Sequence, residues 1–597
     1  MTRKRVVHHP GAAWVAALAG AWLVAAACRT MQGPVASGVA PALAAPVEAA
    51  VPEPALRVGV RVEVEGVSVS AASGVVVRAR VPGETPSLVR TLPRATFRPG
   101  GAGRLRLVET GDLLELATAS AAGTDELLQA DATAYRGILE VRPAQPNLLT
   151  VVNVVSLEDY LRGVVPNELS PQAFPQIEAL KAQAVAARSY ALAHLRDYAS
   201  KGFDVCATPA CQVYRGQASE HPLTDRAVRE TAGVIASWRG RPINAYYTST
   251  CGGHTEGGEA IFDDQAPYLK GVACPSEGSS RHRVRTTAEP RRDLPGGSET
   301  AHDVALLEAL GVIDAGEASP AWLGAAPSEA EKSAWIEGAE ARLGPGDRLA
   351  AEDAAFLEDP AQTRAGALAR LASALEKAGT PGLAQGELAG SADGRLSILH
   401  GEAADSHPID PGVRLFRDLG GAHAGTAELA LSVGDRVLYV ERDGQVVYLE
   451  AEEKGPGEAA GAGSRHYRWE VRLTPDPVAR AVGRYGSVGR VRDIVPKRLG
   501  VSGRVVELSV QGSDGELELR GLKVRWGLGL RENLFVVHRE RGPRGDVEQF
   551  VITGKGWGHG VGLCQVGAFG MAQAGSTFEE ILRHYYSGVR VGARPLL

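Results

Sequence analysis

One carboxylate in this chain lies in a setting that favours acid–base chemistry. Glu168 ends the stretch LEDYLRGVVPNE, which joins an apolar run at 151–155 to a segment from Pro175 onward with apolar residues at helical spacing. The β-branched run predicts a buried strand, and the periodic segment predicts one long helix. Lys181 and Arg188 lie on a neighbouring face of that helix, so we expect both to bind an anionic or heavily hydroxylated substrate beside Glu168.

A second stretch with chemical potential is GKGWGHGVGLCQVGA, which begins at Gly554. Its glycines let backbone amides approach a ligand or a catalytic loop closely. His559 is the side chain in this stretch with an ordinary pKa near neutrality, so we expect it to orient the substrate or Glu168, and we expect Gln565 to contact the substrate. A nucleotide-binding loop is excluded, because no GK[ST] closes the motif and no G-x-G-x-x-G register fits the glycines.

These stretches resemble one family. LEDYLRGVVPNEL followed by EALKAQAVAARSYAL is similar to the core signature of stage II sporulation protein D and the amidase enhancers (SpoIID/LytB). The glycine-rich stretch resembles the family's GxGHGxGMSQxGA, with Leu563 in place of the methionine and Cys564 in place of the serine. The resemblance implies a lytic transglycosylase that cleaves peptidoglycan strands stripped of stem peptides, with Glu168 as the catalytic residue.

A single carboxyl group suffices for that reaction, whereas ordinary glycosidases need two. The acid protonates the leaving oxygen, and the resulting carboxylate accepts the proton of the muramyl primary hydroxyl as that hydroxyl closes on the anomeric carbon. Partial burial of Glu168 should raise its pKa toward about 6. The alternative function is a glycan-binding enhancer that stimulates a separate N-acetylmuramoyl-L-alanine amidase; a zinc amidase lacks its H-E-x-x-H set here.

The loop STCGGHT, which begins at Ser249, follows a predicted hairpin with strands at 234–238 and 243–248. The resemblance implies that this loop lines the groove beside the glutamate. Tyr246 or Tyr247 would then stack on a sugar ring. Three further side chains would donate to sugar hydroxyls, namely Ser249, His254 and Thr255.

The cysteines admit two interpretations. Because export favours oxidation, we expect the disulfides Cys206–Cys211 and Cys251–Cys274, a scheme that does not include Cys564. Some family members hold zinc near this region through Cys and His, and the irregular spacing argues against such a site here. That alternative zinc set would be Cys206, Cys211, Cys251, His254 and Cys274. No other metal or cofactor is expected.

The first 28 residues are typical of an export signal. A basic start at Arg3 precedes an apolar run at 11–27, which is short for a membrane span. Cys28 follows VAAA and predicts lipidation, with a plain signal peptide as the alternative. Residues 29–54 form an Ala/Pro-rich linker. We therefore expect an extracytoplasmic protein of the periplasm or cell envelope that meets the membrane only through a lipid anchor.

A chain of 597 residues is too long for one core. The net charge of −6 is modest and no basic block stands out, so nothing in the composition indicates nucleic acid as a partner. The family resemblance implies peptidoglycan glycan strands as the ligand. The family pattern covers 55–282 and 466–597, and 283–465 is an insertion.

The sequence of the insertion is helical at first, with a capping box at Ser328, and then contains a hairpin with strands at 436–441 and 445–450. We expect an α+β fold that is rich in strands, with one long helix beside the catalytic region. The insertion adds helices and a small SH3-like barrel, and its expected role is binding or spacing.

Overall fold

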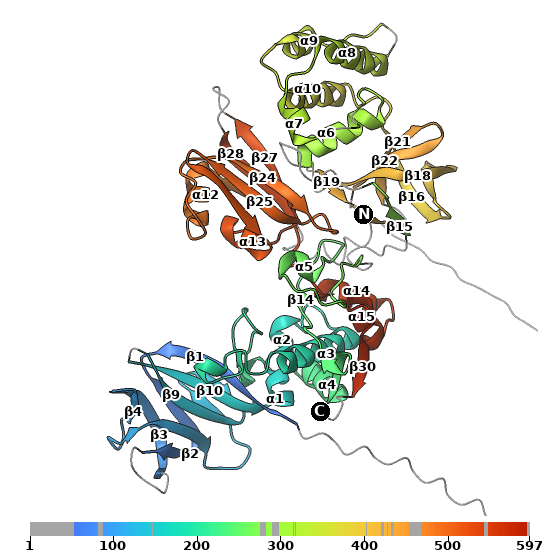
Figure 1. Cartoon of the computed structure of the whole chain (residues 1–597). Coiled ribbons are helices and arrows are strands. Elements are labelled where there is room, and N and C mark those ends of the chain that lie inside the picture. Colours follow the sequence, from blue (N-terminus) through green and yellow to red (C-terminus); the bar gives the residue numbers. More distant parts are fainter. Residues whose placement is uncertain are drawn as a thin grey trace, which may run out of the picture. The chain divides into compact units, whose positions relative to one another are not determined.

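The computed structural model (Figure 1) describes residues 53–593 apart from 82–87, 146, 275–281, 289–297, 315, 317, 345, 402, 419–422, 427, 432–434, 453–467 and 542–546. The predicted signal peptide, the lipidation site at Cys28 and nearly all of the predicted linker lie outside the described residues. Among the helices that are described, none is long and apolar enough to cross a membrane.

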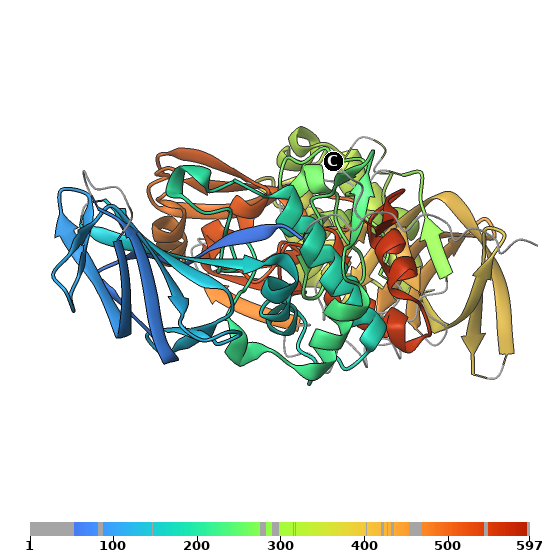
Figure 2. The ribbon, with the colours of Figure 1, turned by 90° about the horizontal axis from the view of Figure 1, so that it is seen from below.

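The first region is a large sheet, seen in blue and cyan in Figures 1 and 2. Its strands are β1 (Ala55–Val64), β2 (Val67–Arg80), β3 (Leu88–Gly101), β4 (Arg104–Leu107), β5 (Leu113–Leu114), β6 (Leu116–Ala121), β7 (Leu128–Ala130), β8 (Thr133–Tyr135), β9 (Ile138–Ala144), β10 (Leu148–Ser156) and β11 (Val205–Cys206). The main path is β11-β1-β10-β9-β6-β2-β3-β4-β5; off this path, β7 pairs with β2, and β8 pairs with β7. Six of the nine positions of β10 are buried, as its β-branched sequence predicts.

β10 leads directly into the helices around Glu168. They are α1 (Leu157–Arg162), α2 (Val165–Glu168), α3 (Ile177–Ala193), α4 (Pro222–Glu230) and α5 (Gly258–Ile261), with 3₁₀ turns η1 (Ala199–Lys201) and η2 (Gln217–Ser219). The Ser156 hydroxyl caps α1 by accepting from the Asp159 N–H at 3.2 Å. α3 is rich in alanine and largely buried, because small side chains allow neighbours to approach it closely.

The end of the chain packs against α3. The elements of this last part are β29 (Leu563–Cys564), α14 (Gln565–Gln573), α15 (Phe578–Tyr585) and β30 (Arg590–Ala593). Strands from the middle of the chain pair with β29 and β30 or lie beside them; they are β12 (Val234–Trp238), β13 (Arg241–Pro242) and β14 (Tyr247–Thr248). α14 and α15 contact α3, and one core joins side chains from 56–274 with side chains from 561–589. The predicted hairpin is only half correct: β12 pairs with β13 and β30, whereas β14 pairs with β29.

Residues 468–555, which precede these last elements of the chain, form a separate β-rich region. Its elements are β23 (Arg468–Leu473), α12 (Pro475–Val482), β24 (Val491–Leu499), β25 (Val505–Gly512), β26 (Gly515–Arg520), α13 (Leu522–Leu528), β27 (Phe535–Arg541) and β28 (Val547–Lys555). Two three-stranded sheets, β23-β28-β27 and β24-β25-β26, enclose a core of their own. The predicted region 466–597 therefore contributes to two cores.

The insertion has helical and β parts. Its elements are β15 (His282–Arg285), α6 (Ser298–Ala309), α7 (Pro320–Gly324), α8 (Glu329–Leu343), α9 (Ala351–Glu358), α10 (Arg364–Lys377), β16 (Ala384–Ala392), β17 (Arg395–His400), β18 (Ala403–Asp418), β19 (His423–Thr426), β20 (Glu428–Leu431), β21 (Arg436–Arg442) and β22 (Gln445–Glu452). Ser328 and Glu331 form the predicted capping box of α8.

The predicted small barrel is present. β16, β17, β18, β22 and β21 close on themselves through pairing of β17 with β18. The turn between β21 and β22 has Asp443 and Gly444 at positive φ, as the Asp-Gly signal predicts. The expectation of a strand-rich fold of helices and strands is confirmed; an SH3-like relationship of the barrel stays a prediction.

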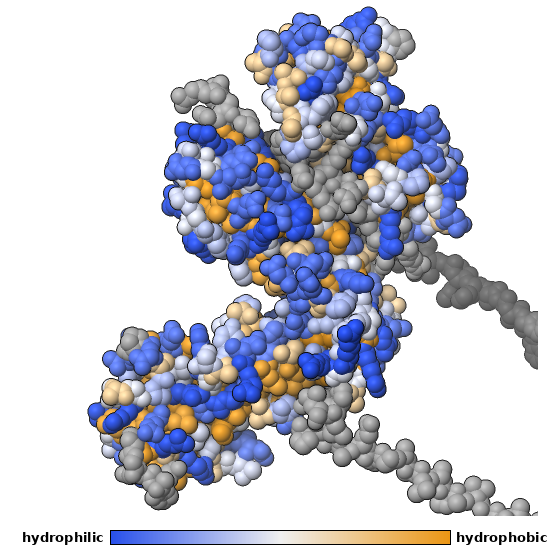
Figure 3. All heavy atoms as spheres, in the orientation of Figure 1, coloured by the Kyte–Doolittle hydropathy of each residue, from blue (hydrophilic) through white to orange (hydrophobic). Residues whose placement is uncertain are grey.

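On the face drawn in Figure 3, hydrophilic residues are interspersed with smaller apolar areas.

Candidate active site

Glu168 lies in a cleft of about 1010 Å³ whose walls are rich in aromatic rings. The rings come from segments far apart in the sequence, which are α3 and the turn after it, the β14 segment, the end of α5, α13 and the glycine-rich loop that precedes β29. The aromatic residues are Tyr190, Tyr198, Tyr246, Tyr247, Phe262, Trp526 and Trp557. Flat apolar faces bordered by polar groups suit the binding of sugar rings.

Glu168 is fixed by two hydrogen bonds. Its Oε1 accepts from the Val213 backbone N–H at 2.6 Å, and its carboxyl group also bonds the Tyr247 side chain. The Tyr247 hydroxyl accepts from Gln212 Nε2 at 3.1 Å, and Gln212 Oε1 accepts from the Tyr160 hydroxyl at the same distance. This chain of side chains places the carboxyl group in one orientation at the cleft.

Burial raises the pKa of Glu168, and the hydrogen bonds from Val213 and Tyr247 lower the pKa by a smaller amount. Desolvation disfavours the charged form, so the proton is retained to a higher pH than in an exposed glutamate. The predicted direction is confirmed. Glu168 can therefore enter a reaction as an acid and, once ionised, receive a proton as a base.

The Cys206–Cys211 disulfide holds the segment that supplies the Val213 N–H. Cys206 lies in β11, which pairs in parallel with β1, so the disulfide ties this segment to the edge of the first sheet. Tyr214, next to Val213, donates its hydroxyl to Asn153 Oδ1 of β10 at 2.8 Å. The predicted disulfide is thus present, and it positions the hydrogen-bond donor to Glu168.

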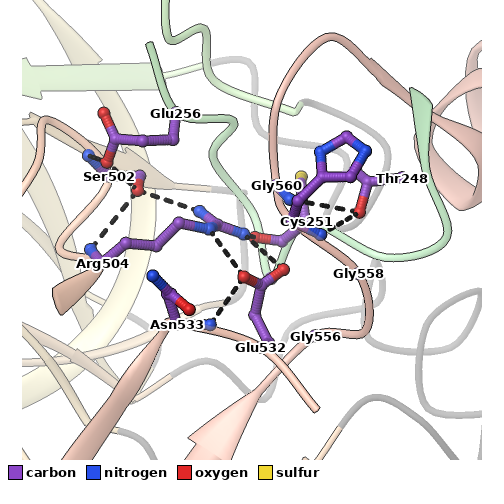
Figure 4. A network of polar contacts seen from close by, with 12 residues as sticks. Thr248, Cys251, Glu256, Ser502, Arg504, Glu532, Asn533, Gly556, Gly558 and Gly560 are labelled. Carbon is purple, nitrogen blue, oxygen red and sulfur yellow. Dashed lines mark hydrogen bonds and ion pairs between the residues drawn. The ribbon is translucent and has the colours of Figure 1, made fainter. Parts of the chain in front are cut away.

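The glycine-rich loop is held against β14 by Thr248. The Thr248 Oγ1 accepts from the N–H groups of His559 and Gly560, each at 3.2 Å, and donates to the Trp557 carbonyl. Gly558 has φ 126°, and a Cβ there would lie 2.1 Å from Thr248 Oγ1. A glycine is therefore needed at 558 so that this loop can approach β14 (Figure 4).

His559 lines the cleft as a neutral imidazole. Burial, followed by the nearby charges of Arg525 and Arg504, lowers the pKa of His559 to about 3. Its Nδ1 accepts from the Val561 N–H at 3.1 Å, and the ring also hydrogen bonds the Tyr247 backbone. The prediction that His559 titrates near neutrality is wrong, because the ring is desolvated and faces cations. Its contacts make it a positioning residue for Tyr247, which in turn bonds Glu168.

A buried ion pair lies within the region that begins at β23, and its arginine also contacts the loop after β14 (Figure 4). The Arg504 guanidinium lies 3.3 Å from Glu532, and both side chains have no exposed surface. Arg504 also donates to the backbone carbonyls of Cys251 at 2.6 Å and His254 at 2.7 Å. A Cβ at Gly560 would lie 2.1 Å from Arg504 Nε, so the glycine-rich loop packs directly on this side chain.

Glu256 extends the same network. Its Oε2 accepts from the Ser502 hydroxyl at 2.6 Å, and its Oε1 accepts from the Val501 N–H at 3.1 Å. The Ser502 hydroxyl in turn accepts from Arg504 at 2.9 Å. The loop that follows β14 is therefore positioned by side chains that lie about 250 residues later in the chain.

Four predicted substrate-binding residues have structural roles instead. Lys181 pairs with Glu178 at 2.8 Å and Glu230 at 2.9 Å. Arg188 is 1% exposed and forks onto both oxygens of Glu158, at 2.8 and 2.6 Å. Neither cation lines the cleft, because both are needed to join α3 to its neighbours.

The other two lie in the STCGGHT loop, and neither lines the cleft. His254 is buried, and its Nδ1 lies 2.6 Å from the Thr255 carbonyl. The Thr255 hydroxyl is buried and exchanges hydrogen bonds with the Val272 backbone. By contrast Tyr247, Ser249, His559 and Gln565 line the cleft as predicted, together with Tyr246.

The predicted Cys251–Cys274 disulfide is absent, which corrects the second disulfide assignment. Both residues are buried thiols, and they lie beside the third buried thiol, Cys564. The alternative zinc set is not assembled either, since Cys206 and Cys211 are joined to each other. Cys564, which the disulfide scheme did not include, belongs to the cluster because β14 and β29 pair through Thr248 and Cys564.

Most of the aromatic wall was not predicted from the sequence. Trp557 stands inside the glycine-rich motif, and Trp526 lies in the stretch RWG at 525–527, so an aromatic residue flanked by glycine was an available signal. Trp526 is 51% exposed, and it lines the cleft. Phe262 and Tyr190 have no local signal, because only the fold brings them to the cleft.

Comparison with known proteins identifies two segments of the chain. Residues 145–238 match the model of a family described as stage II sporulation protein (SpoIID), and residues 450–562 match a domain of unknown function, DUF8618. The first segment contains Glu168, Val213 and the Cys206–Cys211 disulfide. The second covers the separate β-rich region and ends inside the glycine-rich loop.

Three curated relatives share part of the chain. An uncharacterized protein of Brachyspira hyodysenteriae is 45% identical over 139 residues, which are 23% of this chain and 37% of the relative. The amidase enhancer of Bacillus subtilis is 40% identical over 109 residues, which are 18% of this chain and 14% of the relative. Stage II sporulation protein D of the same organism is 37% identical over 140 residues, 21% of this chain and 40% of the relative. The chain thus spans less than half the length of each relative.

Replacing Glu168 by glutamine should stabilise the protein at neutral pH. The folded state resists ionisation of Glu168, so the wild type has its full stability below the ordinary pKa of 4.5 and loses stability as pH rises through the higher folded pKa. Glu168→Gln has no such loss. Urea unfolding at several pH values should therefore show a difference that is near zero at pH 4 and favours the variant at pH 7. The exposed Glu337→Gln serves as the control, and an equal pH trend in both variants would contradict the burial argument.

Arg504→Met should destabilise the protein by about 3–5 kcal/mol, because it leaves Glu532 buried without its cation. Arg504→Met combined with Glu532→Gln should recover part of that loss, since the buried charge is then removed. The matched control is Arg520→Met, which breaks the exposed contact with Glu518 and should cost at most about 1 kcal/mol. Urea unfolding provides the measurement, and an Arg504→Met cost no larger than the control would refute the assigned role.

Proposed function

Because residues 145–238 carry a segment of the SpoIID family, we propose that the cleft cleaves the MurNAc–GlcNAc bond of peptidoglycan glycan strands by lytic transglycosylation, with Glu168 as acid and then base. The observation that carries the proposal is a half-buried carboxyl group with a raised pKa, held at the wall of an aromatic cleft. This function places the protein at the cell envelope, where peptidoglycan is found. Membrane contact would be limited to a lipid anchor at Cys28.

The reaction needs two proton transfers and no water. Glu168 donates its proton to the glycosidic oxygen as the bond between that oxygen and the muramyl anomeric carbon breaks. The muramyl C6 hydroxyl oxygen then bonds the anomeric carbon, and its proton passes to the Glu168 carboxylate. The products are a free GlcNAc hydroxyl and a 1,6-anhydromuramyl end, and Glu168 returns to its protonated form.

The hydrogen bonds to Glu168 suit both halves of this cycle. Burial keeps the group protonated before reaction, which favours its action as an acid. After proton donation, the Val213 N–H and the Tyr247 side chain stabilise the carboxylate until it accepts the second proton. Trp526, Trp557 and Phe262 supply ring faces for the sugars on either side.

The cleft contains one other carboxylate among its described lining residues. Asp197 lies 2.6 Å from His194 Nδ1 and belongs to the part of the wall that also includes Tyr198. A two-carboxylate hydrolase would use such a group as nucleophile or base. Asp197 therefore provides the means to distinguish hydrolysis from transglycosylation.

A second candidate is favoured by the relative named amidase enhancer. Under this function the cleft binds glycan without cleaving it, and a separate N-acetylmuramoyl-L-alanine amidase is the partner. The same aromatic wall serves both functions, because stacking requires no proton transfer.

The contact of Arg417 of β18 with the Gly252 carbonyl at 3.2 Å joins the insertion to the loop after β14, which fits a role of the insertion in wall binding or spacing.

Glu168→Gln should lower the rate of strand cleavage by at least about 10²-fold, while glycan binding persists, because glutamine keeps the shape but cannot exchange the proton. Mass spectrometry of digests should find anhydromuramyl ends from the wild type, with peptide-free strands cleaved faster than peptide-bearing ones. The wild-type rate should fall as pH rises through the raised pKa of Glu168. No such ends, together with equal stimulation of an added amidase by wild type and variant, would establish the enhancer instead.

Asp197→Asn should change the cleavage rate by less than about tenfold, because transglycosylation takes both proton transfers from Glu168. Tyr198→Phe, at the same part of the wall, controls for altered packing. The product ends are measured in parallel by mass spectrometry. A loss as large as that of Glu168→Gln, with reducing muramyl ends in the wild-type digest, would identify a hydrolase.

A further inference from the structure

Three buried thiols meet behind the cleft. Cys251, Cys274 and Cys564 are each at most 1% exposed, and their Sγ atoms all lie within 4.8 Å of one another. They come from three segments: the loop after β14, the stretch that follows α5, and the strand β29. A disulfide joins two sulfur atoms, whereas three sulfur atoms come together here.

The surroundings leave little room at the cluster. The Tyr585 hydroxyl of α15 lies 2.9 Å from Cys274 Sγ. A Cβ at Gly567 would lie 2.2 Å from Cys274 Sγ and 2.1 Å from the Tyr585 hydroxyl, so any side chain at 567 would fill the space beside the sulfur. Glycine at this position therefore preserves a compact pocket formed by the sulfur atoms and one hydroxyl oxygen.

We propose that Cys251, Cys274 and Cys564 bind one thiophilic metal ion, either Zn²⁺ or Cu⁺. Thiolates are soft ligands that select these two ions over Mg²⁺, Ca²⁺ or Mn²⁺. Three sulfur atoms complete a trigonal Cu⁺ site. Zn²⁺ takes a fourth ligand, and the Tyr585 hydroxyl is the oxygen beside the cluster.

This site differs from a zinc set built on Cys206 and Cys211, since those two are joined as a disulfide and hold the Val213 segment. The ion would instead link three segments at the back of the cleft. Cys564 directly precedes Gln565, which lines the cleft. In the pairing of β29 with β14, Cys564 lies opposite Thr248, the residue that holds the glycine-rich loop. The ion is therefore structural and stabilises the cleft wall, whichever reaction the cleft performs.

The chain provides a mild variant for the test. Cys564 also caps α14, because its Sγ accepts from the Gly567 N–H at 3.3 Å. A serine hydroxyl is a good helix cap, so Cys564→Ser keeps this hydrogen bond while removing a thiolate. Cys251→Ser removes a second ligand. The matched control is the double variant Cys206→Ser with Cys211→Ser, which lies outside the cluster.

The experiment measures metal content of the purified full-length protein by mass spectrometry, after loading with Zn²⁺ or with Cu⁺ under reducing conditions. Wild type and the control should bind about one ion per chain, whereas Cys564→Ser and Cys251→Ser should lose at least tenfold in affinity. Removal of the ion by a chelator should lower the melting temperature of wild type and control but not of Cys564→Ser. Circular dichroism confirms that each variant is folded.

The proposal is overturned if loaded wild type binds neither ion in the folded state. It is also overturned if Cys564→Ser binds as tightly as wild type, or if the control loses the ion. Thiol mapping that finds any two of the three cysteines joined as a disulfide in the purified protein has the same consequence. X-ray absorption at the metal edge then identifies Zn²⁺ or Cu⁺ and counts the sulfur ligands.

Discussion

The buried contact between Arg504 and Glu532 is the interaction on which the cleft depends. Both side chains lack exposed surface, and Arg504 also satisfies the carbonyls of Cys251 and His254. A buried cation requires that all its partners stay in place, because an uncompensated charge in the interior is very unfavourable. The position of Arg504 therefore fixes the loop after β14 and the glycine-rich loop at once, and with them one wall of the cleft.

The opposite wall is positioned by a different kind of contact. Burial raises the pKa of Glu168 and so favours its uncharged form, whereas the Val213 N–H and Tyr247 lower that pKa by a smaller amount. The disulfide at Cys206 ties the Val213 segment to the first sheet, and His559 reaches Tyr247 from the second wall. The two walls thus meet at Tyr247, so the pKa of the Glu168 carboxyl group depends on both.

The packing of α14 and α15 against α3 joins the two ends of the described chain in one core.

Much of the local structure follows from the sequence. The buried strand before Glu168, the long α3, the capping box of α8 and the hairpin between β21 and β22 are set by periodicity, caps and turn residues, which act over a few positions. Glu168 itself was identified because its flanking motif lies in one continuous stretch. The glycines of the loop at 554–568 indicated close backbone approach, and the contacts of Gly558 and Gly560 show where it occurs.

The tertiary structure decided what local patterns do not contain. Lys181 and Arg188 have helical spacing that fits a binding face, yet Lys181 pairs with Glu230 of α4 and Arg188 with Glu158 of α1, so both are structural. Export favoured a Cys251–Cys274 disulfide, but pairing of β14 with β29 brings Cys564 to the same place. His559 has an ordinary side chain, and only burial beside two arginines makes it neutral. Local sequence determines the conformation of short segments, whereas charge partners, desolvation and sulfur clustering depend on residues from tens to hundreds of positions apart.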